Sequence, residues 1–117
     1  HRPDEGIAIM AAPTGPQLCS TALFKGFLEL SDRYQLCRHT HLLETRAQKM
    51  LANEKFACSA VEYLHQVGFL GPTTSLAHSI WLDESDIEIL ATTQSTADAN
   101  ARHVAACDEA GIRVGVG

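Results

Sequence analysis

Short apolar runs alternate with longer stretches in which apolar residues recur at helical spacing, and no other feature of the 117-residue chain constrains its fold as strongly. Four runs have the length of single strands: residues 6–12, 36–43, 75–80 and 112–116. Because helical sequence separates them, the pattern predicts repeated β-α units with parallel strands and covering helices. We therefore expect an α/β fold in one domain, residues 1–117.

The expected helices begin near residues that favour helix N-termini. They are residues 21–34 after Ser20, a helix from about Thr45, one after Ser59, one after Asp83, and one from Asp98 to Gly111. Ser59 and Glu62 have the spacing of a capping box, and Gly68 is a typical stop for the helix that they begin.

Composition and charge argue against two classes of partner. The net charge is −5 and Lys and Arg are scattered, which argues against a nucleic-acid surface. No run approaches about eighteen apolar residues, so we expect no membrane span. Residues 1–5 lack the apolar core of a signal peptide. The four cysteines, which have neither C-x-x-C nor zinc-finger spacing, are Cys19, Cys37, Cys58 and Cys107. These features predict a cytoplasmic protein whose reduced cysteines act as small apolar residues.

Three side chains suited to metal and proton chemistry fall at the ends of two consecutive predicted strands. His41 and Glu44 form an H-x-x-E sequence, and His78 closes a later apolar run. Because the C-terminal ends of parallel strands meet at one edge, we expect the three side chains to converge. An imidazole can bind a metal ion that acidifies water, and a nearby carboxylate can take the water's proton. Taken alone, His78 is more typical of a hydrogen-bonded core histidine. The functional site is favoured because both the H-x-x-E sequence and His78 lie at the ends of consecutive strands.

Two further polar residues leave alternatives open. In a strand, His39 and His41 would place both rings on one face, roughly 6.5–7 Å apart. They could form a metal-binding pair. We favour instead that His39 contacts the metal ligands without binding the metal, or that it faces the interior of a barrel. Gln17 follows the first predicted strand, where it either contacts a polar substrate or, as we favour, fills the loop.

Four sequence runs carry a resemblance to a known family. They are APTGPQLCS at residues 12–20, HTHLLETRAQ at 39–48, GFLGPTTSLAHS at 68–79 and AGIRVGVG at 110–117. In this order they resemble the metal-dependent amidohydrolase superfamily, in the branch that holds cytosine, guanine and S-adenosylhomocysteine deaminases and the triazine chlorohydrolases.

The resemblance implies a partial (β/α)₈ TIM-type barrel, from about the fourth strand to the eighth, with one divalent metal, zinc ahead of iron. It implies that His41 is the fifth-strand metal ligand, that Glu44 is the catalytic general acid/base, and that His78, on the sixth strand, orients the water or the substrate. The family's other ligands are a first-strand H-x-H pair and an Asp after the eighth strand, so the metal site in this chain is incomplete. Residues 94–102 also depart from the family's seventh-strand run.

Three functional hypotheses follow. The first is an amidohydrolase or deaminase fragment, whose parent hydrolyses a non-peptide C–N bond of a small heterocycle or amine. The second is a non-catalytic α/β assembly or binding module derived from such an enzyme. The third is a homo-oligomer in which exposed sheet edges pair and chains complete a site together.

Overall fold

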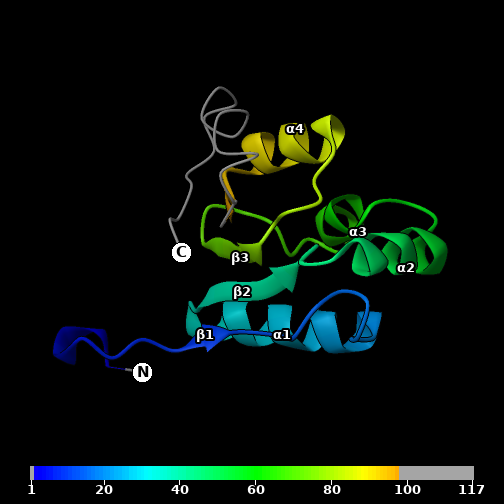
Figure 1. Cartoon of the computed structure of the whole chain (residues 1–117). Helices are drawn as coiled ribbons and strands as arrows, with labels where there is room; N and C mark the ends of the chain where they lie inside the picture. The colour runs from blue at the N-terminus through cyan, green and yellow to red at the C-terminus, as the bar shows by residue number, and fades with distance from the viewer. Residues whose placement is uncertain (1, 98–117) are drawn as a thin grey trace.

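The computed structural model describes residues 2–97, which form one parallel sheet with flanking helices (Figure 1). The elements in chain order are η1 (Pro3–Glu5), β1 (Met10–Ala11), α1 (Thr21–Tyr34), β2 (Cys37–Leu42), α2 (Arg46–Phe56), α3 (Ala60–Gln66), β3 (Thr74–His78), α4 (Glu84–Thr93) and β4 (Thr96–Ala97). The strand order is β1-β2-β3-β4, and every neighbouring pair is parallel. The predicted α/β fold with parallel β-α units is confirmed.

The first strand is shorter than its apolar run predicts. Only Met10 and Ala11 pair with β2, and Met10 lies opposite Cys37, the first residue of that strand. Residues before Met10 therefore have no β2 residue beside them. Gly6 instead takes a positive φ of 75°, Arg2 and Ile7 form an isolated antiparallel bridge, and η1 lies away from the sheet (Figure 1).

The last strand that the structure describes, β4, was not predicted. Its residues Thr96 and Ala97 pair with Ser75 and Leu76 of β3, although no apolar run marks them. The predicted helix from Asp98 to Gly111 and the strand at 112–116 lie outside the described residues, as does Cys107.

The two faces of the sheet differ in what covers them. In β2, Thr40 and Leu42 are fully buried, whereas Cys37 and His41 are exposed and His39 is half-buried. Because successive side chains of a strand point to opposite faces, the even positions face the helices and the odd positions face the open side. Leu76 of β3 continues the covered face, and Ser75 lies beside His39 on the open one.

Aromatic side chains from four segments form the centre of the covered face. The ring of Phe24 in α1 meets Phe69 and Tyr63 edge to face, with centroids 5.2 and 6.0 Å apart, and Tyr63 stacks on Phe56 at 3.8 Å. Edge-to-face and offset contacts are favoured by the ring quadrupoles. This core fixes α1, α2 and α3 against the sheet.

The helix N-caps lie at the predicted residues, but one predicted capping box is only half formed. Ser20, Thr45 and Ser59 each accept a hydrogen bond from a first-turn backbone N–H, and Asp83 is the N-cap of α4. Ser59 and Glu62 make only half of the predicted capping box, because the Glu62 carboxylate pairs with Gln66. No described helix has the length and hydropathy to cross a membrane.

Replacing Ser59 by Ala is expected to lower the free energy of unfolding by about 2–3 kcal/mol. The hydroxyl caps α3 and also donates to the fully buried carboxylate of Asp86 at 2.5 Å, so its loss removes a cap and leaves a buried oxygen short of a partner. Ser20→Ala, which removes an exposed cap of α1, should cost about 1 kcal/mol. Urea unfolding of both variants checks this, and equal losses would contradict the role of the Ser59–Asp86 bond.

The cysteines do not all act as small apolar residues. Cys19 is buried in the core, but Cys37 is exposed at the start of β2, because it occupies an open-face position of that strand. Cys58 is half-buried, and burial, followed by the negative charge of Glu62, raises the pKa of its thiol.

Iodoacetamide should therefore modify Cys37 faster than Cys58 near neutral pH. The raised pKa lowers the thiolate fraction of Cys58, and the thiolate is the reactive form. Time-resolved peptide mass spectrometry measures both rates in one sample. Glu62→Gln should speed the modification of Cys58 while leaving Cys37 unchanged, whereas faster labelling of Cys58 than of Cys37 would contradict the assignment.

Candidate metal-binding and catalytic site

The three predicted site residues lie at the C-terminal ends of β2 and β3. His41 is the next-to-last residue of β2, Glu44 follows that strand by two residues, and His78 ends β3. The two segments stay together beyond the strands, because the amides of Ser79 and Ile80 donate to the carbonyls of Leu42 and Leu43 at 2.8 and 3.2 Å. These main-chain bonds hold the site residues at one mouth of the sheet.

Left-handed backbone at the strand ends aims the side chains. Leu43, His78 and Ser79 have φ values of 50°, 73° and 48°. Strand alternation would point His78 into the helix layer, like Leu76, but its positive φ breaks the extended geometry and brings its ring beside His41. Such residues cost about 1–3 kcal/mol each and cluster at functional sites.

His41, His78 and Glu44 make direct contacts. His41 Nδ1 lies 3.0 Å from His78 Nε2, and the two rings stack with centroids 5.1 Å apart. The same His78 Nε2 lies 3.7 Å from Glu44 Oε2. The Glu44 side chain is 49% exposed and that of His78 32%, so the cluster is open on one side.

A second set of residues supports the cluster, and of these the sequence had singled out only His39 for such a role. Ser75 Oγ lies 2.7 Å from His39 Nδ1, and the His39 ring stands edge-on to His41 at 5.9 Å. The Gln48 side-chain oxygen accepts a hydrogen bond from the backbone N–H of Glu44 at 2.8 Å. The backbone carbonyl of Thr14 accepts one from the backbone N–H of His41 at 3.2 Å. Gln48 lies four residues after Glu44, in the first turn of α2, and this spacing was the signal that could have identified it.

The donor set of residues 2–97 fits one part of a metal site. No group of three or more His, Cys, Asp and Glu side chains within that range has the geometry to hold an ion. His41 Nε2, however, makes no hydrogen bond to any described residue, and a neutral imidazole nitrogen is a preferred zinc ligand. If Nε2 binds a metal, the ring proton is on Nδ1 and donates to His78 Nε2, an outer contact that orients the ligand.

Comparison with known proteins identifies the family of the chain. The amidohydrolase family profile matches residues 2–117. The chain is 35% identical over 91 residues to the 5-methylthioadenosine/S-adenosylhomocysteine deaminase of Halothermothrix orenii, covering 78% of this chain and 21% of that protein. It is 36% identical over 88 residues to the 5'-deoxyadenosine deaminase of Methanothermobacter thermautotrophicus, covering 75% and 21%. The chain thus spans about a fifth of the length of these relatives.

A solved structure shows the same fold. The zinc complex of the atrazine chlorohydrolase TrzN from Arthrobacter aurescens TC1 matches with a TM-score of 0.76 and 19% identity, over 89% of this chain and 25% of that one. The expected part of a TIM-type barrel and the resemblance to the deaminases are both confirmed, and the likeness to the chlorohydrolase is one of fold. With a family match over nearly its whole length, the chain belongs to the amidohydrolase family.

Proposed function

We propose that this chain supplies part of the active site of a zinc-dependent deaminase that hydrolyses the C–N bond of an adenosine derivative. Two similar proteins carry the names of adenosine-type deaminases. The observation that carries the proposal is the contact of His41, His78 and Glu44 at neighbouring strand ends. In the reaction, water adds to the ring carbon, the amine leaves as ammonia, and a carbonyl group remains.

Each of the three side chains has a proposed role. A bound zinc ion would act as a Lewis acid and lower the pKa of water. His41 would hold the metal through Nε2. Glu44, open to the mouth of the site, takes a proton from the attacking water and gives it to the leaving amine. His78 holds the His41 ring with Nε2, and its Nδ1, which makes no hydrogen bond to a described residue, orients the water or the substrate.

The proposal extends to the wider setting of the chain. Residues 1–117 would form part of a single catalytic barrel, in a cytoplasmic enzyme that acts on a small molecule and binds no nucleic acid. The outer edges of β1 and β4, the edge strands of the described sheet, would pair with further strands, either of the same protein or of a second copy.

An ammonia-release assay tests the proposed reaction. The protein from the complete reading frame that contains these residues is loaded with zinc and given 5'-deoxyadenosine, 5'-methylthioadenosine, S-adenosylhomocysteine or atrazine. We expect one ammonia per nucleoside, with the matching inosine-type product by mass. Chloride release from atrazine without deamination, or no product from any substrate, would overturn the proposal.

A further inference from the structure

The backbone N–H of Glu44 is held by a side chain of the helix that follows it. Gln48 Oε1 accepts its hydrogen bond at 2.8 Å, and no other described residue accepts from this N–H. Because a backbone N–H can only donate, the atom that it meets is the oxygen of the Gln48 carboxamide. Gln48 is half-buried in the first turn of α2. The residue proposed to carry the proton is therefore tied to this helix through its main chain.

This bond reaches one residue further than the bond of a usual capping box. In that motif, the side chain at the third helical position accepts from the backbone N–H of the N-cap residue. The helix α4 follows the rule, because Asp86 Oδ2 accepts from the Asp83 N–H at 3.0 Å. In α2 the N-cap is Thr45, yet the Gln48 side chain accepts from Glu44 instead. Glutamine has a longer side chain than aspartate, and this length allows it to reach the residue before the N-cap.

Little else restrains the Glu44 side chain. Its carboxylate is 49% exposed, makes no hydrogen bond with residues 2–97, and lies 3.7 Å from His78 Nε2. The preceding residue, Leu43, has a positive φ of 50°, a conformation that residues other than glycine adopt at a cost. The position of the carboxylate therefore depends on a strained main chain that needs an outside contact to keep its shape, and Gln48 supplies that contact.

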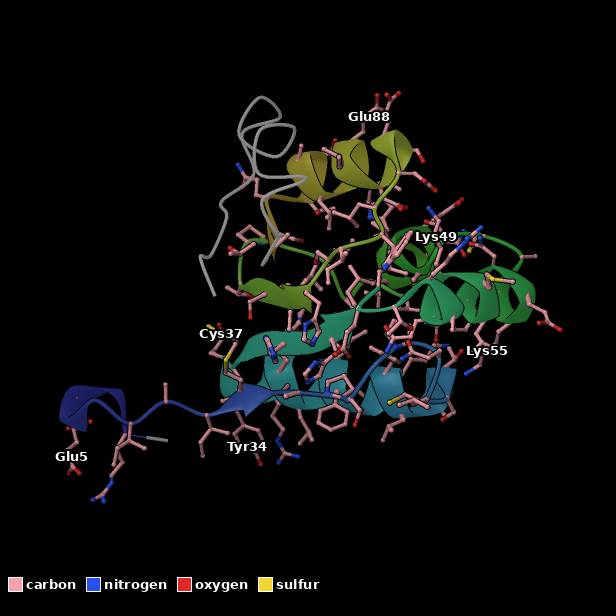
Figure 2. The ribbon with its side chains drawn as sticks, in the orientation of Figure 1. Glu5, Tyr34, Cys37, Lys49, Lys55 and Glu88 are labelled. Carbon is pink, nitrogen blue, oxygen red and sulfur yellow. The ribbon has the colours of Figure 1, made fainter. Side chains whose placement is uncertain are left out.

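The first turn of α2 is itself anchored to the segment that follows β3. Lys49 donates to Asp83 Oδ1 at 2.5 Å, and Asp83 lies five residues after His78, the last residue of β3 (Figure 2). Two consecutive residues of one helical turn thus contact the segments after both strands: Gln48 contacts the segment after β2, and Lys49 contacts the segment after β3. The turn holds the Glu44 main chain relative to the strand end that carries His78.

On the basis of the proposed deaminase function, we propose that Gln48 is a positioning residue, which holds Glu44 where its carboxylate meets the attacking water. Gln48 touches neither the metal nor the reacting atoms, and it acts through the Glu44 main chain. Without the carboxamide oxygen, the Glu44 N–H loses its acceptor, and the carboxylate occupies the productive position for less of the time. A misplacement of about 1 Å can slow a reaction about 100-fold. The loss therefore falls on kcat, because neither substrate binding nor zinc binding depends on this bond.

The variant Gln48→Met tests this role, because methionine has a similar length and helix propensity but lacks the carboxamide oxygen. In the zinc-loaded protein from the complete reading frame, kcat should fall about 10- to 100-fold, while KM changes less than about 2-fold and the zinc content stays the same. The control is Gln66→Met, which replaces an exposed glutamine of α3 and should change none of the three quantities. An unchanged kcat in Gln48→Met, or a loss that takes the form of a higher KM alone, would overturn the proposal.

Hydrogen–deuterium exchange separates this inference from the proposed reaction. The exchange rate of the Glu44 backbone N–H, resolved by electron-transfer fragmentation, requires neither substrate nor turnover. We expect exchange about 5-fold faster in Gln48→Met and close to wild type in Gln48→Glu, whose carboxylate oxygen can accept the same bond. This pattern supports Gln48 as the anchor of the Glu44 main chain even if the protein releases no ammonia. Equal exchange in all three proteins would overturn the proposal even if deamination occurs.

Discussion

Replacing Glu44 by Gln will lower kcat for deamination by about 10²- to 10⁴-fold, the usual contribution of a positioned general acid/base. The amide keeps the size of the side chain and its place near His78 Nε2, 3.7 Å from the native carboxylate, but it cannot take a proton from water. Zinc content and KM should change little, because the proposed role of Glu44 is proton transfer and not ligation. Steady-state kinetics with a zinc measurement on the same sample checks both parts.

The matched control for this experiment is Glu88→Gln. Glu88 is an exposed carboxylate on α4, and Figure 2 shows it on the outer side of that helix. Its replacement removes the same charge from the protein without touching the strand ends. A kcat within about 2-fold of wild type in both variants would rule out Glu44 as the proton carrier.

Replacing His41 by Ala is expected to weaken zinc binding more than any other single change among the described residues. Loss of an outer-shell hydrogen bond typically costs about 10- to 100-fold in metal affinity, and loss of a ligand should exceed that range. His78→Ala, which removes only the partner of His41 Nδ1, should fall within the range. Competition with a chromogenic chelator gives the zinc dissociation constants of the wild-type protein, His41→Ala and His78→Ala.

His65→Ala provides the control for a histidine away from the site. His65 lies in α3, exposed, on a helix whose buried side chains face the core. The zinc affinity of the His65→Ala variant should match that of the wild-type protein. If His41→Ala also matches the wild type, His41 is not a ligand, and the cluster would have to act without binding the metal through this residue.

The central strands and the helix starts could be predicted because their signals are local. β2 and β3 each have an apolar run and a neighbouring strand on both sides. Three of the N-caps are Ser or Thr residues whose hydroxyl oxygen accepts a hydrogen bond from a backbone N–H in the first turn of the helix. β4 could not be predicted in this way, since the pairing of Thr96 and Ala97 depends on the position of β3 and not on their own hydropathy.

The site was predictable in place but not in orientation. The sequence alone indicates that His41, Glu44 and His78 end consecutive strands. Strand periodicity would nevertheless place the His78 ring among the helices, and only the left-handed backbone at this residue turns it toward His41. The roles of the three residues stay predictions until the variants above are measured.

The alternation along β2 also bears on how such a chain can diversify over evolutionary time. Thr40 and Leu42 belong to the interior that makes the protein fold, whereas His39 and His41 stand on the opposite side and add little to that interior. A change at an odd position therefore alters chemistry at small cost to folding, and a change at an even position does the reverse. Selection can adjust the two properties separately, so new reactions can arise on an inherited scaffold.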